Sequence, residues 1–284
     1  MNVLSIQSSV AFGHVGNAAA TLPLQRLGHE VWGVHTVQFS NHPGHGKWRG
    51  RVFPTAEVAE ILAGIAEMGL LAECHAVLSG YLGEAATGDA ILAVLTRAKT
   101  TNPSLVYCCD PVMGDDGTGL FVRPGIPEFF AAHGVPAADI VTPNRFELEQ
   151  LTGIPVATLD QARAAARTIL KRGPTQVLVS GLGAPLLHEG KIGTLLVGRD
   201  EEWLVTTPAL PIAQTPKGTG DVLTALFLGH RLQGLASPLC LSKAVSAVYA
   251  LIEAAAQSGL REMPLVAAQD RWVSPAMTFD SERI

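Results

Sequence analysis

The stretch Thr-Pro-Lys-Gly-Thr-Gly-Asp-Val-Leu-Thr-Ala-Leu, residues 215–226, leads from a polar segment into a buried element. The apolar run after Asp221 reaches Gln233, which is long enough to favour a helix over a strand. Gly218 and Gly220 at its start let the backbone turn sharply and leave several N–H groups unpaired. Together with the helix dipole, these N–H groups predict a site for a phosphate or another anion.

Asp221 lies beside this predicted anion site, where the positive field of the helix start favours its ionised form. A charged carboxylate there can accept a proton from an attacking hydroxyl group. The backbone of Gly218, Thr219 and Gly220 would at the same time stabilise a transferring phosphoryl group. The alternative is that Asp221 only caps the helix, as Asp does in many proteins. Residues elsewhere in the chain have to decide between the two interpretations.

The composition is that of a compact globular protein. Of the 284 residues, 48% are hydrophobic and 16% are charged, which excludes disorder for most of the chain. The net charge of −5 and the absence of a basic stretch argue against nucleic acid as a partner. The sequence shows neither a linker nor an internal repeat, so a single domain covering residues 1–284 is predicted.

The expected location is the cytoplasm. Cys108 and Cys109 are adjacent within an apolar run, and Cys74 and Cys240 are far away, which suits neither a disulfide framework nor a metal site. The N-terminus does not resemble a signal peptide, and no uncharged apolar run is long enough to span a membrane. The sequence therefore predicts no membrane association.

Strands and helices alternate along the first two thirds of the chain, which predicts an α/β fold with a mostly parallel sheet and helices on both faces. Residues 185–207 predict a small antiparallel meander, with its first strand at 186–189. The expected strands are 3–7, 30–37, 76–81 (ending in a loop), 105–111, 139–144 and 176–180. The expected helices are 17–27, 55–68 with Thr55 as its cap, 84–99, 145–151, 159–172, the helix after Gly220, and 239–257.

Two segments are expected to be loops. Residues 8–17, after the first strand, are rich in glycine and small polar residues. Residues 38–51 are rich in glycine and histidine and predict a mobile surface loop. His42 and His45 could form a metal pair, but they are expected to be solvated or to contact a ligand, because no carboxylate or cysteine is expected nearby to complete a metal site.

Polar side chains gather where the predicted parallel strands end. Several carboxylates beside an anion site would repel a phosphate group unless a cation intervenes, and Mg²⁺ suits such a site. The chemistry predicted is phosphoryl transfer, without a Walker A segment. Taken singly, the acidic residues also fit a solvated turn or a first-turn residue matched to the helix dipole. The residues are Ser8, Asp110, Asp115, Asp116, Asn144, Glu147 and the 218–221 turn.

Six short motifs along the chain resemble those of a known enzyme family. Five are Ile-Gln-Ser at 6–8, Val-Gln-Phe-Ser-Asn-His at 37–42, Ser-Gly-Tyr-Leu-Gly at 79–83, Asp-Pro-Val-Met-Gly-Asp at 110–115 and Thr-Pro-Asn-x-x-Glu at 142–147. The sixth, Gly-Thr-Gly-Asp at 218–221, resembles the anion-hole motif of the ribokinase superfamily. Together they resemble the motifs of pyridoxal kinases, which use ATP to phosphorylate the 5′-hydroxymethyl group of vitamin B6, and the similarity runs essentially end to end.

The resemblance implies a ribokinase-like αβα sandwich, a homodimer, Mg²⁺ and often activation by K⁺. It assigns Asp221 as the base, with Gly218, Thr219 and Gly220 as the anion hole. It places Ser8, Pro43, Gly44 and Tyr81 at the vitamin, and Asp115 and Glu147 at the metal. The positions implied for ATP are Asp110, Thr142, Glu147, Ser180, Gln214, Thr215, Pro216 and Lys217.

Three positions depart from the family pattern. Ser9 stands where many relatives carry His, Pro43-Gly44 replaces a Thr-containing pair, and Ser180 stands where several bacterial relatives have Lys. Two other functions stay open at this point. One is a hydroxymethylpyrimidine kinase of thiamin synthesis, which has the same fold and reaction. The other is a B6-binding carrier with weak activity.

Overall fold

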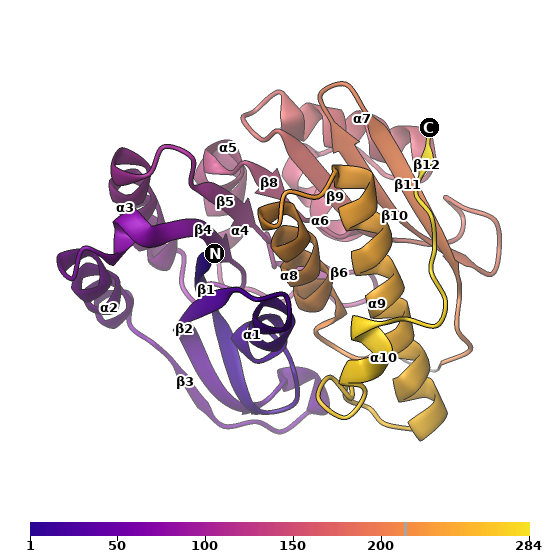
Figure 1. Ribbon diagram of the computed structural model, residues 1–284, viewed down its shortest axis with the longest axis horizontal. Coiled ribbons are helices and arrows are strands. Elements are labelled where there is room, and N and C mark those ends of the chain that lie inside the picture. The colour runs from indigo at the N-terminus through magenta and orange to yellow at the C-terminus, as the bar shows by residue number, and fades with distance from the viewer. Residues whose placement is uncertain (213–214) are drawn as a thin grey trace.

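The computed structural model describes residues 1–212 and 215–284, which form a ten-stranded sheet with helices on both faces (Figure 1). The strand order is β12-β11-β10-β9-β8-β5-β4-β1-β2-β3. The middle strands run parallel, as their mostly buried sequences indicate. They are β9 Gln176–Leu182, β8 Ile140–Val141, β5 Val106–Cys109, β4 Cys74–Ser79, β1 Asn2–Phe12 and β2 Glu30–Asn41.

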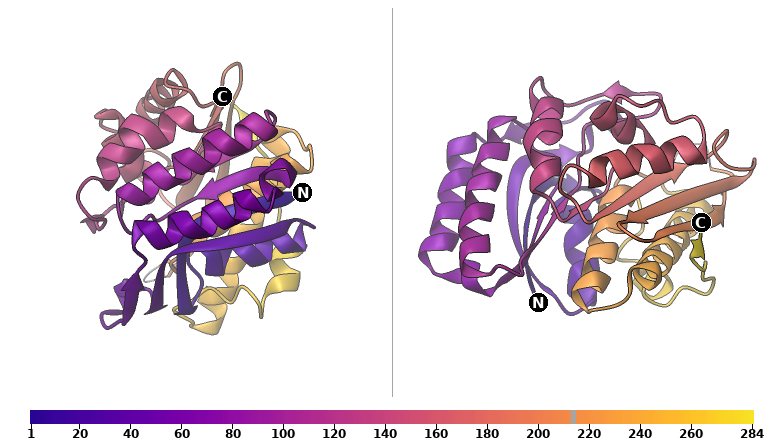
Figure 2. Two further views of the ribbon diagram at one scale, coloured as in Figure 1. Left: turned by 90° about the vertical axis from the view of Figure 1, so that its left-hand side faces the viewer. Right: turned by 90° about the horizontal axis from the view of Figure 1, so that it is seen from above.

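Helices cover the two faces of the sheet and bury a separate apolar cluster on each (Figure 2). One face carries α1 Asn17–Arg26, α8 Thr219–Leu232, α9 Ser237–Ser258 and α10 Gln269–Val273. The other carries α2 Thr55–Glu67, α3 Ala86–Thr101, α4 Ile126–Phe129, α5 Val135–Ala137, α6 Arg145–Thr152 and α7 Leu159–Leu170. The expected α/β fold is confirmed.

Antiparallel strands close the sheet at both edges, whereas the sequence predicted them at one. The edge after β9 consists of β10 Lys191–Gly198, β11 Glu202–Pro208 and β12 Glu282–Arg283. At the other edge β3, Gly50–Val52, pairs with β2. A separate small ribbon is formed by β6, Gly114–Asp115, and β7, Gly119–Leu120. Residues 186–189 form no strand, because the antiparallel partner of β9 starts only at Lys191.

The first two strands are longer than the sequence predicted. β1 continues to Phe12 and pairs with β2 as far as Asn41, so residues 8–12 and 38–41 are strand and not loop. Val10 and Phe39 are buried in a small apolar cluster between these extensions, which explains why pairing prevails over their polar surroundings. The two extensions project the sheet edge beyond the neighbouring β4.

Two helix details also differ from expectation or need explanation. Pro54, not Thr55, is the N-cap of α2, and the Thr55 hydroxyl lies 3.3 Å from Glu84 and Thr87 instead.

Helix α9 is long and apolar enough to cross a membrane by length and composition. Most of that apolar stretch is buried against α8 and the sheet, as in the core helix of a globular protein.

Candidate active site

Helix α8 begins with an uncapped turn at the carboxyl edge of the parallel strands. Gly218 is its N-cap with φ +88°, a left-handed conformation that favours glycine. No side chain in the described ranges caps this helix. A Cβ atom at Gly218 would overlap the carbonyl oxygen of His14, so the loop before α1 packs directly on the turn. The first N–H groups of α8 have no partner within the helix and suit an anion.

Asp221 is the third residue of α8, so the interpretation of this residue as an N-cap is wrong. It is partly exposed at the turn. Desolvation raises the pKa of Asp221 to about 6, while the backbone amides of Gly16 and of Asp221 itself lower it. Near neutral pH the carboxylate is therefore mostly ionised and able to accept a proton.

Beneath this turn lies a buried polar group contributed by three elements. Asp110 follows β5, Thr142 follows β8, and Thr224 lies one turn after Asp221 in α8. The Thr224 hydroxyl is 2.9 Å from Oγ1 of Thr142 and 3.5 Å from Oδ2 of Asp110. Burial first, and then the charges of Glu147 and Asp221, raise the pKa of Asp110 well above its usual range. Asp110, Glu147 and Asp221 thus lie near enough for their charges to interact, and these three residues are called the acidic cluster.

Glu147 is buried at the start of α6, where its carboxylate accepts hydrogen bonds from backbone amides. Oε2 accepts from the Asn144 N–H at 2.9 Å, and Oε1 accepts from the Met113 N–H at 2.9 Å. Asn144 in turn donates to the carbonyl oxygen of Gly114 at 2.8 Å. Burial raises the pKa of Glu147 to about 8 although these amides lower it. Glu147 thus ties the 113–114 loop to α6, and its charge acts on Asp110.

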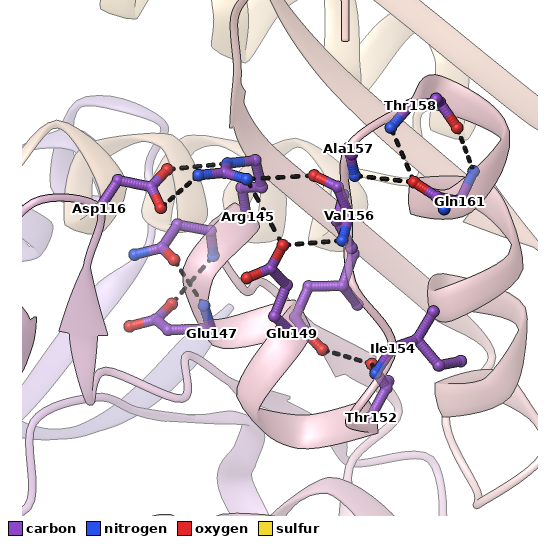
Figure 3. A network of polar contacts seen from close by, with 12 residues as sticks. Asp116, Arg145, Glu147, Glu149, Thr152, Ile154, Val156, Ala157, Thr158 and Gln161 are labelled. Atoms are coloured by element: carbon purple, nitrogen blue, oxygen red, sulfur yellow. Dashed lines mark hydrogen bonds and ion pairs between the residues drawn. The ribbon is translucent and has the colours of Figure 1, made fainter. Parts of the chain in front are cut away.

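The acidic loop after β5 forms ion pairs with two basic side chains. Asp115 Oδ2 lies 3.4 Å from Lys217 Nζ, which brings Lys217 to the rim of the site. Asp116 is exposed and forms a two-pronged ion pair with Arg145, at 2.8 Å and 2.5 Å (Figure 3). Of the two aspartates, Asp115 is the one directed at the site, and Asp116 anchors the loop to α6.

Ser8 and Tyr81 lie at the same edge of the sheet, because β1 and β4 are paired and both residues follow the Ile6–Ser79 match by two positions. Ser8 is buried, and a Cβ atom at Gly16 would overlap its oxygens. Tyr81 is partly exposed and packs beside the Val10–Phe39 cluster. Ser9, which follows Ser8 in β1, is buried in the pairing with Gln38.

The β2–β3 connection forms a flap in which Pro43 and Gly44 are exposed. His42 Nδ1 accepts from the Gly44 N–H at 3.0 Å. Contrary to expectation, a carboxylate does lie near the histidine pair: His45 Nε2 is 2.5 Å from Oε1 of Glu262, between α9 and α10. In Figure 1 the flap approaches this C-terminal loop at the lower edge of the molecule.

Only some of the residues implied for ATP can be placed near the start of α6 or the α8 turn. Ser180 forms an isolated bridge with Asn144, so it borders the start of α6. Thr215 is exposed and Pro216 is buried just before the α8 turn. Gln214 lies outside the described residues. Thr224 and Glu262 were not found from the sequence: Thr224 was signalled only by its spacing of three from Asp221, and Glu262 by nothing.

Comparisons with known proteins agree with this geometry. The sequence model of the phosphomethylpyrimidine kinase family matches residues 54–266. A pyridoxal kinase of Rubrobacter xylanophilus is 52% identical over 285 residues, covering 100% of this chain and 98% of the relative. One of Deinococcus radiodurans is 49% identical over 287 residues, covering 100% and 96%. The chain belongs to the pyridoxal kinase family.

Solved structures support the same fold. The pyridoxal kinase of Leishmania donovani in complex with ADP and pyridoxamine has a TM-score of 0.92 and 29% identity, covering 100% of this chain and 99% of that one. The expectation of a ribokinase-like pyridoxal kinase is therefore confirmed for fold, family and enzyme class. The comparisons do not test the roles of individual residues, and these roles stay predictions.

Proposed function

We propose that Asp221 removes the proton from the 5′-hydroxyl group of pyridoxal while the start of α8 stabilises the phosphoryl group arriving from ATP. The observation that carries this proposal is the uncapped α8 turn with a partly exposed, mostly ionised carboxylate beside it. Backbone N–H groups of Gly218, Thr219 and Gly220 supply fixed positive dipoles where charge develops. Ser8 and Tyr81 hold the pyridine ring, under the Pro43–Gly44 flap.

The nucleotide is proposed to lie on the side of Asp110, Thr142, Ser180 and residues 214–217. Lys217 brings a cation to the rim and is the candidate to replace the lysine that several bacterial relatives carry at position 180. ADP is bound by the solved Leishmania donovani relative, which supports ATP as the phosphoryl donor. Gln214 is assigned to this side by the family resemblance alone.

Mg²⁺ is proposed to be held near Asp115 and Glu147. Within the described ranges no three His, Cys, Asp or Glu side chains are grouped closely enough to enclose a metal. This fits Mg²⁺, which commonly binds through one or two carboxylates, water and phosphate oxygens. The ion supplies charge neutralisation to the phosphates, and the chain positions its two carboxylates through Lys217 and the amides of Met113 and Asn144. K⁺ activation is implied by the resemblance.

Three further assignments complete the proposal. Residues 1–284 act as one domain, built on the single large sheet. The enzyme works in the cytoplasm, where its four cysteines, buried and unpaired in the structure, stay reduced. The resemblance implies a homodimer, and small molecules, not nucleic acid or membrane, are its ligands.

Hydroxymethylpyrimidine phosphorylation is the second candidate, because the family model that matches 54–266 is that of phosphomethylpyrimidine kinase. Five full-length relatives at 41–52% identity are pyridoxal kinases, which favours pyridoxal. A carrier with weak activity is disfavoured by the intact 218–221 turn.

The deciding experiment measures ATP-dependent phosphorylation by the purified protein with Mg²⁺ and K⁺, with pyridoxal and hydroxymethylpyrimidine in parallel. We expect pyridoxal 5′-phosphate from the wild type, and a loss of about 10²–10⁴-fold in kcat for Asp221→Ala, the usual contribution of a positioned base. Binding of pyridoxal should survive in this variant.

The other outcomes separate the alternatives. Turnover of hydroxymethylpyrimidine alone keeps the mechanism and refutes the substrate. Binding of pyridoxal without turnover by the wild type would favour the carrier. Full activity of Asp221→Ala would remove the proposed base.

A further inference from the structure

Thr224 is a buried threonine on the same face of α8 as Asp221, three residues later and 2% exposed. Its hydroxyl reaches Oγ1 of Thr142 at 2.9 Å and Oδ2 of Asp110 at 3.5 Å. Thr142 and Asp110 follow different strands of the sheet. One hydroxyl group thus connects the helix that carries the proposed base with two strand ends that border the nucleotide side.

Four other helical threonines of this chain donate only within their own helix among the described contacts. A threonine inside a helix commonly donates to the carbonyl oxygen one turn earlier in its own helix. Among the described contacts, Thr224 instead reaches side chains of the sheet. The threonines that follow the common pattern, each to the residue four positions earlier, are Thr96, Thr100, Thr152 and Thr168.

The partners of Thr224 need this contact. The Asp110 carboxylate is 5% exposed and lies near the charges of Glu147 and Asp221, which disfavour its ionised form. The hydroxyls of Thr142 and Thr224 act in the opposite direction by hydrogen bonding. Loss of one of these donors would leave a buried oxygen atom without a partner and free Asp110 and Thr142 to move apart.

We propose that Thr224 is a positioning residue, which fixes the Thr142 hydroxyl and the Asp110 carboxylate relative to the helix that carries Asp221. The inference rests on the proposed function, in which Asp221 acts on the acceptor alcohol and Asp110 and Thr142 border the nucleotide. Ser8 and Tyr81, proposed to face the vitamin, lie in β1 and two residues after β4, and no described hydrogen bond of Thr224 reaches them. Loss of the Thr224 hydroxyl should therefore weaken nucleotide binding and slow phosphoryl transfer.

The test compares Thr224→Val, which keeps the shape and loses the hydroxyl, with Thr224→Ser, which keeps the hydroxyl. Thr168→Val, at an α7 threonine that bonds its own helix, is the matched control. For Thr224→Val we expect kcat to fall about tenfold or more, since small misplacements of reacting groups are costly. The KM for ATP should rise several-fold, while the KM for pyridoxal stays within about twofold. Thr224→Ser should recover kcat to within about threefold of the wild type.

Binding of ADP, measured by calorimetry, provides a readout that does not depend on the acceptor. We expect the Kd of ADP to rise several-fold in Thr224→Val and to return in Thr224→Ser, with circular dichroism showing both folded. An unchanged Kd and kcat in Thr224→Val overturn the proposal. So does an equal loss in Thr224→Ser, because shape and not the hydroxyl would then matter. A wild type that binds ADP but does not phosphorylate pyridoxal refutes the proposed function, and the ADP series still decides the role of Thr224.

Discussion

Helices α6 and α8 both begin at the carboxyl edge of the sheet, and both carry an acidic residue at their third position, Glu147 and Asp221. In α6 a capping box closes the turn: Asn144 Oδ1 accepts from the Glu147 N–H at 2.8 Å, and Glu147 accepts from the Asn144 N–H at 2.9 Å. In α8, Gly218 takes the place of Asn144, and no described side chain caps the helix. The N-cap residue thus decides whether the turn satisfies itself or is left for a ligand.

The two carboxylates also differ in their protonation. Burial raises the pKa of Glu147 to about 8 and that of the partly exposed Asp221 to about 6. Near pH 7, Asp221 is mostly ionised. The carboxylate at the open turn is therefore able to act as a base, whereas burial disfavours ionisation of Glu147, which a bound Mg²⁺ would promote.

Among changes that reshape the two turns without removing the proposed base, the largest expected effect comes from closing the open turn with Gly218→Ala. The new Cβ atom would overlap the His14 carbonyl oxygen, and φ +88° is unfavourable for alanine. We expect kcat to fall about 10²-fold or more, because the N–H groups shift from the place where charge develops. The measurement is steady-state kinetics with pyridoxal and ATP, together with thermal melting.

Gly220→Ala is the matched control within the same turn. Nothing lies within 4 Å of a Cβ atom at Gly220, so this variant should melt at or above the wild-type temperature. A smaller kinetic loss than in Gly218→Ala is expected. Wild-type activity in Gly218→Ala would show that the open turn is not the anion site. The α6 and α8 turns would then have no demonstrated difference in function.

The second prediction concerns pH. Because Asp221 must be ionised to accept a proton, kcat/KM should fall about tenfold for each pH unit below the pKa of about 6. The same raised pKa means that ionisation destabilises the fold. This cost is absent below the unfolded pKa, grows between that value and the folded pKa of about 6, and is complete above it. At pH 8 the free energy of unfolding of Asp221→Asn should therefore exceed that of the wild type by about 1 kcal/mol, given the partial exposure of Asp221, and at pH 4 the two should be nearly equal.

Denaturation curves of both proteins at the two pH values test the stability part. An acidic limb near pH 8 in the activity profile would instead point to Glu147 as the base, since its pKa is raised to about 8.

The parts of the site that follow from sequence are those that lie next to each other in the chain or at the ends of parallel strands. The 218–221 turn, Asp110 and Glu147 were predicted because strand ends of a parallel sheet meet at one edge, whereas Thr142 was assigned by the family resemblance. The His45–Glu262 contact joins residues 217 positions apart in two irregular segments, and no local pattern signals it. The extension of β1 to Phe12 was missed because its pairing with β2 prevails over glycine-rich and polar composition.

The smallest expected effect comes from opening the closed turn with Asn144→Ala, compared with Thr158→Ala. Thr158 and Gln161 form an equivalent capping box at the start of α7, away from the acidic cluster (Figure 3). Each substitution should cost about 1 kcal/mol, or about 2–4 °C in Tm. Only Asn144 also donates to the Gly114 carbonyl and helps to hold Glu147 against the loop after β5.

Asn144→Ala should therefore lower kcat about threefold as well, while Thr158→Ala should change stability alone. Equal kinetics in the two variants would mean that the α6 capping box supports the fold without contributing to the site. The closed turn of α6 would then contribute to stability alone and the open turn of α8 to catalysis. Glu147 would act only in the capping of α6.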